Sequence, residues 1–299
     1  MRTRFITAIY SDVFKTHMGG RSDRRDHYRY SLLSLLRMTN ADFVCYTSDR
    51  EIASLRHFFY EQHQIAPSQL EFRVYDLAQT PYAALIEDIR PKSSSPSRPD
   101  RCHEIQYAKL HWFHNEDQTY DYYYWIDAGL SHTGLLPDKY LIKTDGYSYR
   151  SYFDTWIFDN HFLENLHKKS DKRFLLIAKE NVRNFWERTV PEDFYTRYDA
   201  SVHIIGGLLG GHVSSWPRVV DAFDQYLRMV LACEHKLFYE EHILSLMYQN
   251  HKDWFTTLEF DIWLHEDNYL GDPKDLQTNK SFYKVLEELM GDEQKVKSQ

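Results

Sequence analysis

Short strand-like runs alternate with segments of helical periodicity over the first 126 residues. Strands are predicted at residues 5–10, 42–46, 70–75 and 122–126, and helices at 26–39, 50–63 and 103–116. In the first of these helices, apolar and aromatic side chains recur at helical spacing, at Tyr28, Leu32, Leu35 and Leu36. Strands that alternate with helices form βαβ units, whose strands run parallel. The pattern predicts an α/β fold with a mainly parallel central sheet flanked by helices.

The second half continues with a strand predicted at 204–209 and helices at 152–168, 181–188, 216–232 and 238–249. Residues 281–299 are predicted to form an amphipathic helix that ends in a charged tail. The stretch PKSSSPSRPD at 91–100 is rich in proline and serine, which predicts a surface loop and favours a substrate lid. Because the alternation resumes after this loop, residues 1–299 are predicted to form a single domain.

Charge and cysteine usage limit the classes of partner. A net charge of -8 argues against a general affinity for nucleic acid, although a local basic cluster is still compatible with a small anionic ligand. Cys45, Cys102 and Cys233 lack metal-ligand spacing, which is typical of reduced cysteines in a cytoplasmic protein. No window approaches ~18 uninterrupted apolar residues, so no transmembrane segment is expected. Peripheral contact with the inner face of a membrane stays open.

The strand predicted at 122–126, YYYWI, carries bulky side chains on both faces, as a central strand requires. Asp127 follows at its carboxyl end, where ligands bind in open α/β sheets. Ala128 and Gly129 leave room for a ligand or metal ion to approach the backbone. An aspartate that caps the next turn is an equal alternative.

A second distinctive stretch is GGLLGG at 206–211, which holds four of the eleven glycines. Its spacing does not match a phosphate-binding loop. Contact with an acceptor sugar at Gly206, Gly207 and Gly210 is one interpretation, and a tight strand pair or a glycine-rich hairpin is the other.

Several segments, in their order and spacing, resemble nucleotide-sugar glycosyltransferases of the GT-A fold, and most of all the small bacterial HtrL/YibB-type family found with lipopolysaccharide and surface-glycan genes. These are FITAIYSD, GGR, HYRYSLLSLLRMTNADFVCYTSD, IQYAKL, YYWIDAGLS, IIGGLLGGHVSSW and YEEHILSLMY, within residues 3–265. The resemblance implies a single GT-A-like (Rossmann-like) domain, in which 1–132 bind the nucleotide sugar and 133–280 the acceptor. It implies sugar transfer from a UDP- or GDP-linked donor to a glycan or lipid-linked glycan acceptor.

The resemblance places Asp127 at an Asp-x-Asp-like motif that binds a divalent cation, Mn²⁺ or Mg²⁺, against the donor diphosphate. The second acidic position of the motif is Gly129 in this sequence. One carboxylate seldom suffices for either ion, so His265 is the candidate for a further ligand. Arg21 and Lys109 are expected at the diphosphate.

The nucleotide base is expected near Thr7, Ala8 and Tyr10 at the end of the first strand, and near Asp49 after the second. A core position for Tyr10 is an equal alternative. By analogy with the family, Glu241 is the acidic residue at the reacting centre, either as general base or as a residue that positions the acceptor. Glu240 is expected to face elsewhere on the helix.

Two further functions are compatible with the residues. A nucleotidyltransferase would build the sugar nucleotide itself. Enzymes of that class have a basic glycine-rich loop after the first strand, and GGRSDRR at 19–25 resembles this loop only distantly. A non-catalytic carbohydrate-binding protein would stack sugar rings on the many tyrosines and tryptophans, but the strand–helix alternation argues against the mostly all-β lectin modules.

Overall fold

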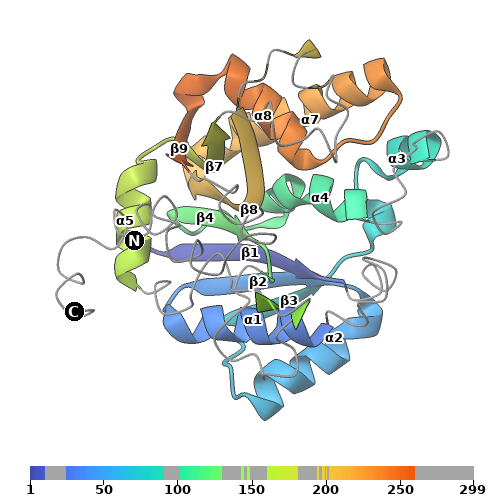
Figure 1. Cartoon of the computed structure of the whole chain (residues 1–299). Helices are drawn as coiled ribbons and strands as arrows, with labels where there is room; N and C mark the ends of the chain where they lie inside the picture. The colour runs from blue at the N-terminus through green and yellow to red at the C-terminus, as the bar shows by residue number, and fades with distance from the viewer. Residues whose placement is uncertain are drawn as a thin grey trace.

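The computed structural model describes residues 1–10, 25–90, 102–129, 143–144, 147–148, 160–180, 194, 197–198, 200 and 202–259. Within these ranges the main feature is a seven-stranded sheet of order β3-β2-β1-β4-β8-β7-β9 (Figure 1). Its strands are β1 (Thr3–Ile9), β2 (Asp42–Thr47), β3 (Leu70–Val74), β4 (Tyr122–Ile126), β7 (Phe174–Glu180), β8 (Val202–His212) and β9 (Phe255–Glu259). A separate two-stranded pair joins β5 (Lys143–Thr144) and β6 (Tyr147–Ser148).

The sheet is mainly parallel, as predicted. Parallel ladders join β1 to β2 and β4, β2 to β3, and β7 to β9, whereas β8 runs antiparallel to both β4 and β7. The chain steps outward from β1 to β2 and β3, and then returns to place β4 on the other side of β1. The carboxyl ends of β1 and β4 therefore meet where the strand order reverses, which is the usual ligand position in such sheets.

Helices cover both faces of the sheet (Figure 1). One face carries α1 (Arg25–Met38), α2 (Asp49–Arg56) with the π-helical turn η2 (His57–Gln62), and α5 (Asn160–Ser170). The other carries α3 (Ala83–Ile89), α4 (Cys102–His111), α7 (Trp216–Glu234) and α8 (Glu240–Asn250). Short 3-10 turns are η3 (Leu77–Gln79), η5 (Trp112–Asn115), η10 (Val213–Ser215) and η11 (Lys252–Trp254).

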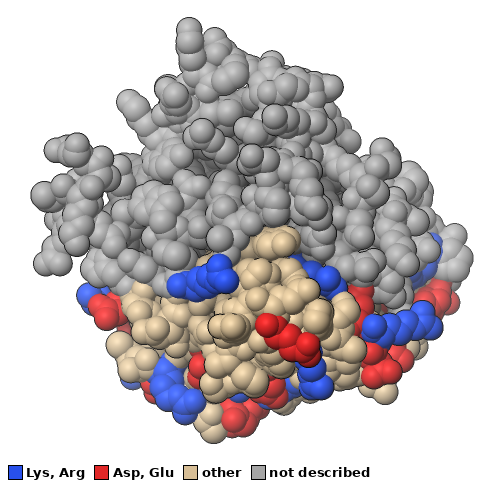
Figure 2. All heavy atoms as spheres, turned by 90° about the horizontal axis from the view of Figure 1, so that it is seen from below, with Lys and Arg blue, Asp and Glu red and all other residues tan. Residues whose placement is uncertain are grey.

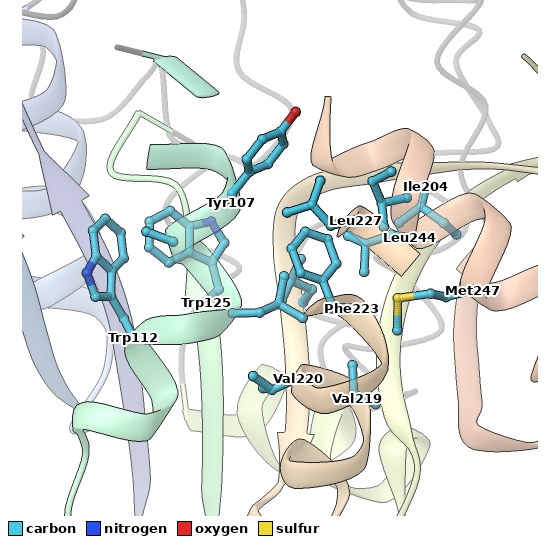
Figure 3. Packing of buried hydrophobic residues seen from close by; sticks show 14 of the residues in the cluster. Tyr107, Trp112, Trp125, Ile204, Val219, Val220, Phe223, Leu227, Leu244 and Met247 are labelled. Atoms are coloured by element: carbon cyan, nitrogen blue, oxygen red, sulfur yellow. The ribbon is translucent and has the colours of Figure 1, made fainter. Parts of the chain in front are cut away.

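The core beneath α4, α7 and α8 is rich in aromatic side chains (Figure 3). Trp112 and Trp125 stack with ring centroids 5.7 Å apart, and the side chains of Phe223 and Leu227 come from α7. The indole N–H of Trp216, the first residue of α7, donates to the carbonyl oxygen of Tyr123 at 2.9 Å. Buried indoles that find such a partner fix a helix as well as fill space, so α7 is anchored on β4.

Two surface properties bear on partners. Seen from below, Lys and Arg side chains are interspersed with Asp and Glu side chains (Figure 2). The described residues on this side thus present no continuous basic face of the kind that binds nucleic acid. None of the helices in the described ranges combines the length and the apolar character needed to cross a membrane.

Most sequence-predicted elements are present, with differences. The helix predicted at 152–168 is found as α5 at Asn160–Ser170, and the strand predicted at 204–209 extends over all of β8. Strands β7 and β9 were not predicted from the sequence. The loop at 91–100, the helix at 181–188 and the terminal segment at 281–299 lie outside the described residues.

We expect the stability of the fold to fall between pH 6.5 and pH 4 because of His167. Its ring is buried, stacks on Tyr122 at 3.9 Å between centroids, and lies 2.9 Å from the hydroxyl of Thr3. Burial lowers the pKa of His167 to about 4. In this window the unfolded chain binds a proton that the native state does not, so acidification favours unfolding.

Between pH 6.5 and pH 4 the free energy of unfolding should fall by about 3 kcal/mol because of His167, at 1.36 kcal/mol for each unit by which its pKa is lowered. Urea unfolding at pH 7 and pH 4.5 measures it against the variant His167→Phe, which retains a ring for stacking. The variant should lose less stability on acidification than the wild type. Parallel pH dependences of the two proteins would contradict this prediction.

Candidate functional site

Lys109 lies at the centre of a buried charged cluster. It comes from α4, whose side chains are buried on every side because the helix lies between the sheet and α7 and α8. Its ammonium donates to Glu240 Oε1 at 2.6 Å and to the carbonyl oxygen of Gly206 at 3.1 Å, and it is paired with Asp127 Oδ1 at 3.1 Å. Burial alone would lower the pKa of Lys109, but Asp127 and Glu240 outweigh it and raise the pKa above its ordinary value. The ammonium is therefore charged.

Asp127 follows β4 directly, at the carboxyl end of the sheet. Its backbone N–H donates to the carbonyl oxygen of Gly207 at 2.8 Å, which continues the pairing of β4 with β8. The carboxylate accepts the indole N–H of Trp125 on Oδ1 at 2.8 Å, in addition to the ion pair with Lys109. The side chain is nevertheless 43% exposed. Asp127 thus presents an oriented carboxylate to solvent.

Glu240 and Glu241 form the first turn of α8, where the helix dipole favours negative charge. Glu240 is buried, and its Oε2 has no hydrogen-bond partner among the described residues. Burial raises the pKa of Glu240 to about 7, against the opposing effect of Lys109. The expectation that Glu240 faces elsewhere is wrong, because it reaches Lys109 while the Glu241 carboxylate reaches strand β8.

Strand β8 carries a bulge at this point. Leu176 pairs with Leu209 but Ile177 pairs with Ile205, so residues 206–208 are extra relative to β7. Gly206 uses its N–H to donate to Glu241 Oε1 at 3.0 Å and its carbonyl oxygen to accept from Lys109. Bulges commonly redirect backbone groups next to active sites. We refer to Lys109, Asp127, Glu240, Glu241 and Gly206 as the lysine cluster.

Gly206 and Gly210 of the GGLLGG stretch are required for two different structural reasons. A Cβ atom on Gly206 would lie 2.4 Å from Glu240 Oε1 and 3.2 Å from Lys109 Nζ, so the absence of a side chain makes room for the ion pair. Gly210 has φ +142°, and a Cβ there would lie 2.3 Å from the carbonyl oxygen of Tyr123. Of the two interpretations of GGLLGG, the tight strand pair explains Gly210, and a sugar contact there is a wrong expectation because Gly210 packs inside the sheet. For Gly206 and Gly207 the sugar contact stays a prediction.

Two of the residues expected at the nucleotide base are in the core. Tyr10 is 2% exposed, its hydroxyl donates to the carbonyl oxygen of Tyr75 at 2.9 Å, and its ring stacks on Trp112. Thr7 is fully buried as well. The core position of Tyr10 is therefore the alternative that the structure shows, and contact of either side chain with a base stays a prediction. Ala8 is half-buried and Asp49 is exposed, so their contacts stay predictions.

The remaining predicted ligands are only partly placed. Arg21 and His265 lie outside the described residues, and Gly129 is buried directly after the site. The described ranges contain no group of three or more His, Cys, Asp or Glu side chains that could hold a metal ion. Mg²⁺, however, is commonly held by one or two carboxylates together with phosphate oxygens of the substrate. The oriented, exposed Asp127 fits that kind of site.

Comparison with known proteins identifies the fold. Neither a protein-family model nor a curated protein sequence matches the chain. The chain resembles the solved structure of mouse xyloside xylosyltransferase 1 in its apo form, with a TM-score of 0.50 and 8% identity over 95% of this chain and 94% of that one. It also resembles the galactosyltransferase LgtC in complex with donor and acceptor sugar analogues, with a TM-score of 0.52 and 10% identity over 93% and 83%. The predicted α/β fold of the GT-A type is thereby confirmed, and the HtrL/YibB family stays a resemblance.

Proposed function

We propose that the protein is a glycosyltransferase that moves a sugar from a nucleotide-diphosphate donor to a glycan or lipid-linked glycan acceptor. The lysine cluster carries this proposal, because it sets a buried ammonium and an exposed carboxylate at the carboxyl ends of β1 and β4. That is the ligand position of an open α/β sheet. The fold shared with a xylosyltransferase and a galactosyltransferase supports the same chemistry.

The donor diphosphate is proposed to lie against Asp127 and Lys109. A divalent cation, Mn²⁺ or Mg²⁺, is proposed to bind Asp127 together with diphosphate oxygens, and when bound it would neutralise charge on the leaving diphosphate. Lys109 holds the carboxylate of Asp127 in place and adds a fixed positive charge behind it. His265 and Arg21 complete the proposed donor site.

Glu241 is proposed to act on the acceptor. Its carboxylate is held by the N–H of Gly206 and its side chain is 21% exposed, so it is both oriented and accessible. In an inverting reaction the carboxylate would take the proton of the acceptor hydroxyl. In a retaining reaction it would position the acceptor.

A cytoplasmic location is proposed from the cysteines and from the resemblance together. The three cysteines are free, which fits a reducing compartment such as the cytoplasm. A surface glycan or lipopolysaccharide acceptor is proposed from the resemblance alone, and would place the protein at the inner face of the membrane.

The experiment that tests the donor site is thermal unfolding with UDP and GDP, with and without Mn²⁺. A ligand at 100 times its Kd should stabilise the protein by about 2.7 kcal/mol. We expect one diphosphate to stabilise the wild type in the presence of Mn²⁺, and Asp127→Asn to abolish the effect. The matched control is Asp121→Asn, an exposed aspartate that precedes the same strand and accepts the backbone N–H of Arg2.

Sugar-nucleotide turnover then separates the functions. Release of nucleoside diphosphate from a UDP- or GDP-sugar supports the transferase, and release of pyrophosphate from a nucleoside triphosphate and a sugar phosphate would identify a nucleotidyltransferase instead. Binding of glycans with no diphosphate effect would favour the non-catalytic carbohydrate-binding protein and contradict the proposal.

A further inference from the structure

Strand β8 buries a histidine beside the carboxylate of Glu241. His203 is 1% exposed, and its Nε2 lies 3.6 Å from Glu241 Oε2. The other oxygen, Oε1, accepts the N–H of Gly206 at 3.0 Å. Residues 203 and 206 of a single strand thus approach both oxygens of one partly exposed carboxylate.

The helix that carries Glu241 is also fixed to this strand. The hydroxyl of Ser245, one turn further along α8, donates to the carbonyl oxygen of Glu241 at 2.6 Å. The same hydroxyl accepts the backbone N–H of Ile204 at 3.0 Å. The backbone of Glu241 therefore cannot shift relative to His203 without breaking these bonds, and the approach of the two side chains is built into the packing of α8 on β8.

We propose that His203 is a positioning residue, which holds the Glu241 carboxylate in one orientation for the acceptor hydroxyl. This inference rests on the proposed function. A distance of 3.6 Å is longer than a hydrogen bond, but such contacts are often long without substrate and tighten in the complex. With Oε1 held by Gly206, an N–H of His203 directed at Oε2 adds a second fixed contact to the same carboxylate. A base held in one orientation reacts without first having to be ordered.

The test compares His203→Phe, which keeps a ring but has no donor, with His203→Gln, whose amide restores an N–H. We expect His203→Phe to lower kcat by about tenfold to a hundredfold, below the 10²–10⁴ that a general base contributes. The KM for the donor and the stabilisation by nucleoside diphosphate should be unchanged, and His203→Gln should recover most of the rate. A purely structural role would instead lower Tm in both variants and disturb donor binding.

A second measurement does not depend on turnover. In protein labelled with ¹⁵N-histidine, the ring signals of His203 are assigned by their loss in His203→Gln. Glu241→Gln should shift the Nε2 signal, and Glu164→Gln, an exposed glutamate on α5, should not. An unshifted signal, or a His203→Phe variant with the wild-type kcat, overturns the inference while the proposed function stands. If the wild type neither binds nucleoside diphosphates nor transfers sugar, the proposed function fails, and the positioning role fails with it.

Discussion

Replacement of Lys109 by methionine should destabilise the protein by about 3–5 kcal/mol, because it leaves the buried carboxylate of Glu240 without its cation. Glu240 and Lys109 are both almost fully buried, and their charged atoms are 2.6 Å apart. Lys109 bonds Oε1 of Glu240, and Oε2 has no hydrogen-bond partner in the part of the chain that is described. Methionine preserves most of the volume of the side chain, so the measured loss reports charge rather than a cavity. Urea unfolding at pH 9 measures it, because burial raises the pKa of Glu240 to about 7 and the carboxylate must be ionised for the effect.

The size of this loss should depend on pH. The pKa of Glu240 is already raised to about 7 by burial, and removal of Lys109 raises it further. A buried acid whose pKa is raised above its unfolded value stabilises the native state less as pH rises, since the unfolded chain releases the proton first. Lys109→Met should therefore be less stable relative to wild type at pH 9 than at pH 6.

A double-mutant cycle isolates the ion pair. Glu240→Gln alone leaves the ammonium of Lys109 with Asp127 and Gly206, so its cost should be smaller than that of Lys109→Met. The double variant should be more stable than the sum of the two losses indicates, by at least about 1 kcal/mol. Losses that add to within about 0.5 kcal/mol would show that the two side chains do not interact and would contradict the ion pair.

The sequence predicted the elements whose evidence is local. The strands before Asp127 are short apolar runs separated by helical periods, and their order places Asp127 at the carboxyl end of a central strand, as found. Strand β7 was missed because FLLIAKE alternates only weakly, and an apolar run of this length does not distinguish a strand from a buried helix. Strand β9, FTTLE, has only two apolar residues, Phe255 and Leu258, and they do not alternate with the period of a strand.

The site itself depended on contacts that local patterns do not contain. Glu240 was placed on the wrong face because its partner Lys109 is 131 residues away in the chain. The only sequence pattern near Glu240 is the pair of acidic residues at the start of a helix. Such a pair is as typical of a helix N-terminus as of a buried ion pair. Tyr10 was a candidate for the base because it ends the first strand, whereas burial by Tyr75 and Trp112 is a tertiary effect. His203 lacked any sequence signal, since its neighbour Glu241 comes from a helix on another part of the chain.

Gly210→Ala should destabilise the protein by about 4 kcal/mol, the combined cost of backbone strain and of overpacking. Its φ of +142° is one that alanine rarely adopts, and the new Cβ would lie 2.3 Å from the carbonyl oxygen of Tyr123 and 2.7 Å from the Cα of Tyr124. Both atoms belong to the backbone of β4 at the centre of the sheet, so neither can move aside. The measurement is urea unfolding, or the yield of folded protein if the variant does not accumulate.

Gly206→Ala is the matched comparison, because the same methyl group then meets a side chain and not the backbone. The atom in its way is Glu240 Oε1, the partner of Lys109, and Gly206 has no left-handed φ. Alanine should displace the Glu240 carboxylate at a cost of about 1–3 kcal/mol, so the variant should fold but lose the stabilisation by nucleoside diphosphate. If Gly210→Ala retained wild-type stability, the strand-pair explanation would fail. If Gly206→Ala bound the diphosphate as the wild type does, the ion pair would have no part in donor binding, and Asp127 would have to hold the donor without it.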